Sequence, residues 1–173
     1  MSVDRPHPAA SESSDRFPSP EAHGWLGLQG QVCVVTGAGS GIGAATAQAF
    51  AAAGAKVALV DRDLPAARRV AGLLAEQGAQ VLALECDIAD EPAVLAAAQQ
   101  VRRALGPVAA LVNNAGLLRP APLASVTVAE WNAVLAVNLT GYLLCARAFG
   151  QDMLDAGRGS LVHVASVSAL HPQ

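Results

Sequence analysis

The chain has 173 residues, of which 53% are hydrophobic and only 14% are charged, and its formal net charge is −3. This length fits one domain with a sizeable buried core, and the net charge gives no electrostatic reason to expect a nucleic-acid partner. Aromatic residues make up 3%, so the core must be aliphatic, which suits a buried parallel sheet covered by helices on both faces. The longest stretch without charged residues, 22–55, is interrupted by glycines and polar residues, so no membrane span is expected.

Residues 1–24 are predicted to form a disordered tail, because they hold four prolines among Ser, Asp and Glu and show no apolar periodicity. Residues 25–173 are predicted to form one domain. Its cysteines, Cys33, Cys86 and Cys145, are far apart and lack metal-ligand spacing, so we interpret them as reduced, packed thiols and expect no metal site. The N-terminal segment has no apolar core typical of a secretory signal, so a cytoplasmic location is the default expectation.

From Trp25 onward, short apolar runs alternate with helical segments. The predicted strands are 32–36, 56–60, 80–85, 108–114 and 160–166, and the predicted helices are 41–53, 64–77, 90–105 and 127–156. Asp90 is expected to cap the third helix, and Thr127 with Glu130 forms a capping-box pattern at the fourth. The alternation predicts an α/β fold, a doubly wound parallel sheet of the Rossmann type with right-handed crossovers. Few residues follow the fifth strand, so we expect the sheet to be truncated there.

A glycine-rich turn joins the first strand to the first helix. Its four glycines, Gly37, Gly39, Gly41 and Gly43, let the backbone approach a ligand closely, and the new helix points its free N–H groups at the same place. This arrangement is typical of a pyrophosphate site. Asp61 ends the second strand about 20 residues further on, as in dinucleotide-binding folds. A purely structural turn is the alternative interpretation.

Asp61 and its neighbour Arg62 bear on the choice of dinucleotide. The carboxylate can accept hydrogen bonds from both hydroxyls of an adenosine ribose and would repel a 2′-phosphate. An arginine at this place could instead bind that phosphate, or it could lie free in solvent. The pattern favours NAD and leaves NADP as the alternative.

Five segments in this order resemble the short-chain dehydrogenase/reductase family over residues 28–166. They are TGAGSGIG (36–43), CDIAD (86–90), NNAG (113–116), VNLTG (137–141) and VHVAS (162–166). The resemblance implies an NAD(P)-dependent oxidoreductase that transfers hydride between the nicotinamide and a small-molecule alcohol or carbonyl substrate. It also makes a homo-oligomer possible for the complete protein.

The resemblance also implies individual roles. Asp87 and Ile88 would contact adenine, and residues 113–116 would line the cofactor and brace the sheet. Asn138 would hold a water in a proton relay, and Ser166 would orient the substrate oxygen. The implied cofactor-binding residues are Thr36, Gly37, Gly39, Ser40, Gly41, Ile42, Gly43, Asp61, Arg62, Asp87, Ile88, Asn114, Ala115 and Gly116.

Each catalytic candidate has a structural alternative. Without the resemblance, Asn138 could be an Asn satisfied by the backbone, and Ser166 an ordinary loop hydroxyl. His163 is interpreted as structural, because it has no partner spacing. His171 lies in the loop after Ser166, where a substrate contact is possible.

The family's chemistry also requires a Tyr as general acid/base and a Lys four residues later that lowers the pKa of the Tyr. This chain has a single tyrosine, Tyr142, and a single lysine, Lys56, in the wrong order. We interpret Tyr142 as a packed aromatic and expect the catalytic pair to lie shortly beyond Gln173. The 173-residue chain alone is therefore expected to be inactive. The alternative is a non-catalytic dinucleotide-binding or interaction module.

Overall fold

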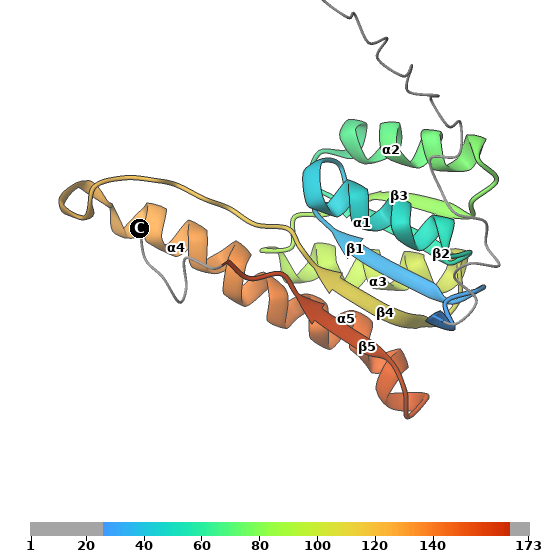
Figure 1. Cartoon of the computed structure of the whole chain (residues 1–173). Coiled ribbons are helices and arrows are strands. Elements are labelled where there is room, and N and C mark those ends of the chain that lie inside the picture. The colour runs from blue at the N-terminus through green and yellow to red at the C-terminus, as the bar shows by residue number, and fades with distance from the viewer. Residues whose placement is uncertain (1–25, 167–173) are drawn as a thin grey trace, which may run out of the picture.

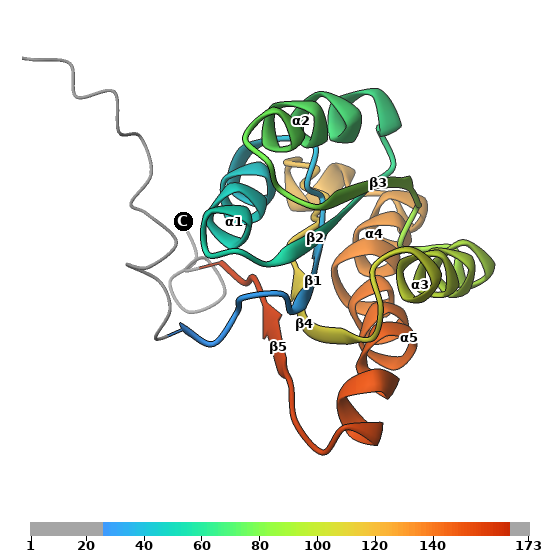
Figure 2. The same cartoon turned by 90° about the vertical axis from the view of Figure 1, so that its right-hand side faces the viewer.

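The computed structural model of the chain describes residues 26–166. These residues form a parallel five-stranded sheet in the order β3-β2-β1-β4-β5, with helices on both faces, as Figures 1 and 2 show. The predicted doubly wound Rossmann fold is confirmed. The tail predicted for residues 1–24, the predicted start near Trp25 and the loop with His171 all lie outside the described residues.

Strands and helices alternate along the chain. The strands are β1 (Val32–Thr36), β2 (Lys56–Asp61), β3 (Val81–Glu85), β4 (Val108–Asn113) and β5 (Ser160–His163). The helices are α1 (Gly41–Ala52), α2 (Leu64–Glu76), α3 (Glu91–Ala104), α4 (Val128–Leu135) and α5 (Tyr142–Asp155), with a short 3₁₀ turn η2 (Leu123–Ser125) and a π-helical segment η3 (Ala136–Gly141). Helices α1 and α2 cover one face of the sheet and α3 and α5 the other (Figure 2).

The central strand β1 supplies both halves of the core. Because side chains alternate along a strand, Val32 and Val34 pack with residues of α3 and α5, whereas Cys33 and Val35 pack with α1 and α2. All five β1 residues are buried. This explains why the strand appears in the sequence as a continuous apolar run without polar alternation.

A half-buried ion pair joins α3, α5 and β4. Arg102 Nε lies 2.7 Å from Asp152 Oδ1, and the Arg102 guanidinium also donates to the carbonyl of Ala148. The second carboxylate oxygen of Asp152 accepts the N–H of Val108, the first residue of β4. These bonds fix the start of β4 against the helix layer.

The helix predicted from Thr127 is continuous through Asp155, but it changes its winding in the middle. The capping box is confirmed, with Thr127 and Glu130 exchanging hydrogen bonds between side chains and backbone N–H groups. The π-helical segment η3 was not predicted. Such segments occur often at functional sites, and this one contains Asn138.

Two other local expectations were correct only in part. Asp90 occupies the N-cap position of α3, but its side chain makes no capping hydrogen bond. The last strand β5 ends at His163, earlier than predicted, and all four of its residues are exposed. An edge strand that packs on one neighbour alone has fewer ladder bonds to extend it.

The continuous helix Val128–Asp155 is long and apolar enough, by length and composition, to cross a membrane. In the structure its second half, α5, packs onto the sheet and buries Leu144, Cys145, Ala148 and Phe149. The first half, α4, extends beyond the sheet (Figure 1). One face of α5 is therefore that of a core helix, whereas Leu143 and Leu154 of the same helix are exposed.

Candidate functional site

A crevice of about 480 Å³ opens at the carboxyl ends of the strands. After β1 the chain builds β2 and β3 on one side, and then crosses back to place β4 on the other side of β1. Ligands in doubly wound sheets bind where the strand order reverses in this way. Most of the cofactor-binding residues implied by the sequence line this crevice: Gly37, Ser40, Gly41, Ile42, Asp61, Arg62, Asp87, Ile88, Asn114, Ala115 and Gly116.

Sequence reasoning missed five residues that line the crevice: Val60, Asp63, Cys86, Leu117 and Val137. Each lies within two positions of a residue that was predicted. Their places at the ends of predicted strands and helices could therefore have indicated them. Thr36, Gly39 and Gly43 were predicted to bind the cofactor, but they are not among the lining residues. Their predicted contacts with the cofactor stay predictions.

The glycines of the turn are needed for close packing. Gly37 has a φ of +66°, and a Cβ there would lie 2.7 Å from the Cα of Ala115. A Cβ at Gly43 would collide with the carbonyl oxygen of Gly37. The turn is thus pressed against the end of β4 and against the first turn of α1.

The start of α1 has the features of an anion site. Gly41 has a φ of +53°, and a Cβ there would project into open space. Ser40 occupies the N-cap position, yet its side chain makes no capping hydrogen bond. Ile42 is 67% exposed although it is apolar. Free N–H groups at a helix N-terminus, with a hydroxyl at the cap that makes no capping bond, are donors for an anion.

Thr36 and Asn114 brace the turn. The buried hydroxyl of Thr36 accepts the N–H groups of Asn114 at 3.0 Å and Ala115 at 3.1 Å. The Asn114 amide donates back to the carbonyls of Thr36 and Gly37. Val35 pairs with Val112 in the parallel register, so Thr36 and Asn114 follow the two strands at the same edge of the sheet. Thr36 therefore holds the wall rather than contacting the crevice.

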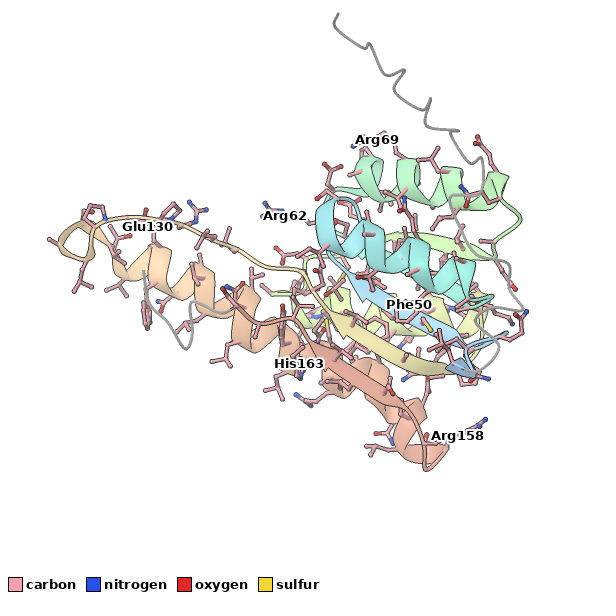
Figure 3. All side chains as sticks on the ribbon, in the orientation of Figure 1. Phe50, Arg62, Arg69, Glu130, Arg158 and His163 are labelled. Atoms are coloured by element: carbon pink, nitrogen blue, oxygen red, sulfur yellow. The ribbon has the colours of Figure 1, made fainter. Side chains whose placement is uncertain are left out.

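Asp61 projects from the end of β2 into the crevice. Its Oδ2 accepts the N–H of Gly39 at 2.8 Å, and its Oδ1 accepts the N–H of Asp63 at 2.9 Å. The exposed Arg62 side chain extends away from the ribbon beside α1 (Figure 3). A carboxylate and a guanidinium thus both lie at the place expected for an adenosine ribose.

The end of β3 contributes the opposite wall. Asp87 Oδ1 accepts the N–H of Ala89 at 2.9 Å, which turns the chain, and Ile88 is buried beneath it. Burial, followed by the charges of Asp87 and Asp90, raises the pKa of the Cys86 thiol to about 11. Cys86 therefore stays protonated at neutral pH and behaves as an apolar lining residue.

Asn138 lies next to the crevice rather than in it. Its Oδ1 accepts the N–H of Leu117 at 2.7 Å, and its Nδ2 donates to the carbonyl of Leu117 at 2.9 Å. Both Leu117 and Val137 line the crevice. The side chain of Asn138 thus has the backbone-satisfied arrangement that was its alternative reading, and it holds the segment after Gly116 against η3.

Ser166 follows β5 as an exposed residue and is not among the residues that line the crevice. A small cluster fixes the strand before it. Val164 donates its N–H to Asn113, and its carbonyl accepts the hydroxyl of Tyr142 at 3.2 Å.

The rings of Tyr142 and His163 are stacked, with centroids 5.3 Å apart. The buried Asn113 amide donates to the Tyr142 carbonyl and lies 3.2 Å from His163 Nδ1. Figure 3 labels His163 at β5. Tyr142 and His163 are therefore packing residues, as the sequence indicated.

Lys56 and Tyr142 are far from forming a catalytic pair. Lys56 begins β2 at the opposite end of the strand from Asp61, and its Nζ donates to the carbonyl of Leu105 at 3.2 Å. Among residues 26–166 the structure brings no three His, Cys, Asp or Glu side chains together as a metal site. The site can therefore bind an organic anion that carries a hydroxylated group next to its charge.

Comparison with known proteins agrees with this geometry. The family described as short chain dehydrogenase matches residues 31–173. D-threitol dehydrogenase of Mycolicibacterium smegmatis is 42% identical over 142 residues, which cover 82% of this chain and 55% of that protein. The chain spans about half the length of the curated relatives it matches.

Solved structures show the same likeness. A metagenomic short-chain oxidoreductase in complex with NADP superimposes with a TM-score of 0.79 at 39% identity, covering 84% of this chain and 66% of that one. A xylitol dehydrogenase with bound NAD⁺ superimposes with a TM-score of 0.81 at 32% identity, covering 84% of this chain and 56% of that one. The chain therefore belongs to the short-chain dehydrogenase/reductase family.

Proposed function

We propose that the chain binds a nicotinamide dinucleotide in this crevice and contributes to hydride transfer between the nicotinamide and an alcohol or carbonyl. The observation that carries the proposal is the presence, in one crevice, of an uncapped helix N-terminus and the Asp61 carboxylate. Membership of a family of oxidoreductases supports it. When bound, the nicotinamide supplies the hydride acceptor or donor.

In this proposal, different walls of the crevice bind different parts of the dinucleotide. The N–H groups at the start of α1 and the Ser40 hydroxyl bind the diphosphate, because they are donors without intrahelical partners. The carboxylate of Asp61 orients the adenosine ribose. Ile88 offers an apolar surface to the adenine, and Asp87 keeps the turn above it in place.

The catalytic side of the proposal rests on Asn138 and Ser166. Asn138 fixes Leu117 and thereby the wall of the crevice beside Val137. Ser166 offers a hydroxyl that can donate to a substrate oxygen from the carboxyl side of β5. The water relay through Asn138 stays a prediction, because its amide group is engaged with Leu117.

We also propose that NAD is preferred over NADP. The Asp61 carboxylate, held on the crevice side by two backbone N–H groups, is compatible with free ribose hydroxyls and repels a 2′-phosphate. Titration calorimetry with NAD and NADP tests this. We expect tighter binding of NAD, and Asp61→Ala should reduce NAD affinity by roughly 1.5–3 kcal/mol, the worth of a hydrogen bond to a charged group. Tighter binding of NADP by the wild type would show that Arg62 dominates.

Polyols are the first substrates to test. One relative is named for D-threitol and one solved structure for xylitol, and both compounds are linear polyols with primary and secondary hydroxyl groups. A second candidate function is a non-catalytic dinucleotide-binding module. It is favoured by the absence of a Tyr-x-x-x-Lys sequence in the 173 residues and by the engagement of the Tyr142 hydroxyl with Val164.

A further inference from the structure

The side chain of Asp61 is held by the fold itself. Its two carboxylate oxygens accept the N–H groups of Gly39 and Asp63 at 2.8 and 2.9 Å. Its own carbonyl accepts the N–H of Cys86 at 3.0 Å. The N–H groups of Gly39 and Asp63 therefore set the orientation of the carboxylate, and the backbone bond from Cys86 fixes the residue that carries it.

The bond to Gly39 lies where β1 leaves the sheet. A backbone bond of 3.3 Å joins Ala38 N–H to the Val60 carbonyl, and the carboxylate of Asp61 receives the next N–H along the turn. A Cβ at Gly39 would lie 2.9 Å from Asp61 Oδ2 and 2.8 Å from the Cβ of Ala66. The turn thus rests directly on the carboxylate and on the first turn of α2.

The same carboxylate can accept further hydrogen bonds. An ionised carboxylate offers about four acceptor positions on its two oxygens, and the structure uses two of them. The remaining positions can accept hydroxyl groups of a ribose. Holding the turn and binding a sugar are therefore compatible.

We propose that Asp61 is a positioning residue for the diphosphate cradle, because its carboxylate fixes Gly39 and thereby the direction in which Ser40 and the start of α1 face. This inference rests on the proposed function for the identity of the ligand. It deepens that function by coupling ribose recognition to the phosphate site. Replacing Asp61 would then damage the phosphate site as well as the cofactor preference.

The proposal predicts an effect opposite to that of simple electrostatics. Removing a negative charge beside an anion site should, by charge alone, tighten the binding of anions. If the carboxylate holds the turn, its removal should weaken them, even for a ligand that has no ribose. The sign of the change therefore separates positioning from charge and from ribose recognition.

Inorganic pyrophosphate is the probe, because it has no ribose. Its affinity is measured by following the backbone ¹⁵N resonances of the turn in wild type, Asp61→Ala and Asp90→Ala. Asp90 is a charge-matched control, since its charge contributes to the raised pKa of Cys86 in the crevice and its side chain makes no capping bond. We expect at least fivefold weaker binding in Asp61→Ala, and unchanged or tighter binding in Asp90→Ala.

A second readout does not need a ligand. Exchange of the Gly39 or the Asp63 amide hydrogen should be at least tenfold faster in Asp61→Asn than in the wild type or in Asp90→Ala, because an amide side chain keeps a single oxygen and its nitrogen cannot accept the second N–H. Asp61→Asn also keeps the side-chain shape, should Asp61→Ala fail to fold. Pyrophosphate binding as tight as that of the wild type in Asp61→Ala, with unchanged exchange of both the Gly39 and the Asp63 amides in Asp61→Asn, would overturn the proposal. If the wild type binds neither NAD nor pyrophosphate, the proposed function fails, and the amide exchange at Gly39 and Asp63 alone decides the positioning role.

Discussion

Thr36 illustrates how single side chains determine the geometry of the crevice. It is fully buried at the end of β1, and its hydroxyl receives two N–H groups from the chain beyond β4. These two bonds hold the chain beyond β4 against the end of β1.

Gly37 should tolerate replacement poorly. Gly37→Ala would put a Cβ 2.7 Å from the Ala115 Cα at a φ of +66°. We expect a loss of stability of roughly 2–4 kcal/mol, from left-handed backbone strain and from overpacking. Gly72→Ala is the matched control, because its Cβ meets nothing within 4 Å in the exposed part of α2. It should stabilise the chain by about 0.5–1 kcal/mol. Equal effects of the two changes in urea unfolding would contradict this account.

The buried thiols predict a loss of stability in alkali. Burial raises the pKa of Cys33 and of Cys145 to about 12 and that of Cys86 to about 11, from an ordinary value of 9.0. Above pH 9 the unfolded chain releases protons that the folded chain retains, so the free energy of unfolding falls as the pH rises toward 12. Below pH 9 these groups add no pH dependence.

Cys33→Ala should reduce the steepness of that fall, because it removes one of the three titrating thiols. The measurement is urea unfolding under reducing conditions at several pH values from 8 upward. The absolute stability of the variant falls at every pH because of the lost side chain, so the comparison is between slopes. Identical slopes for Cys33→Ala and the wild type would show that this thiol does not titrate as its burial requires.

At the scale of the elements, most of the sheet was predictable because each inner strand is buried on both faces. Such strands appear in the sequence as nearly uninterrupted apolar runs, as in β1 and β2. The edge strand β5 has only one neighbour, and its end depends on where Val164 bonds rather than on its own residues. The π-helical segment η3 was missed because its apolar sequence is compatible with an ordinary helix.

The candidate site, like the sheet, was predictable only in part. The glycine turn and Asp61 were predictable, since the backbone geometry of a strand-to-helix turn demands particular residues at fixed positions. The partners of Asn138 were not, because Leu117 belongs to a loop whose path is set by tertiary contacts. Whether Thr36, Gly39 and Gly43 face the ligand or support the wall is likewise decided by packing.

Tyr142 should stabilise the junction between α5 and β5 through its hydroxyl. Tyr142→Phe keeps the ring that stacks on His163 but removes the bond to the Val164 carbonyl. We expect a loss of about 0.5–1.5 kcal/mol and faster amide exchange at Val164. Because Tyr142 is the single tyrosine, its phenolate absorbance reports its pKa directly, and burial should place that pKa above its ordinary value. A free phenol titrating at or below 10.0 would contradict the packed geometry.

On the scale of the whole molecule, the parallel sheet places every functional candidate at its carboxyl edge. In the proposed function, the start of α1 binds the diphosphate and the turn after β3 borders the adenine. The chain spans about half the length of the relatives that match it, so the substrate of the protein is a proposal.

The 173-residue chain should bind dinucleotide but not turn it over. Ser166 and Asn138 alone supply no proton donor matched to an alcohol or carbonyl oxygen, and general acid/base catalysis contributes roughly 10²–10⁴-fold to such reactions. The assay follows the absorbance of the reduced nicotinamide with D-threitol, xylitol and their ketones. Sustained turnover, abolished by Ser166→Ala, would show that a group other than a Tyr-Lys pair performs the proton transfer.

The central claim is that a nicotinamide dinucleotide binds at the carboxyl ends of β1, β2, β3 and β4. Backbone amide shift mapping of the ¹⁵N-labelled chain during titration with NAD tests this claim most directly. The account predicts saturable shifts at Gly39, Gly41 and Asp61, with the amides around Arg102 and Asp152 unchanged. Absence of saturable shifts, or shifts confined to the α3 and α5 layer, would contradict it.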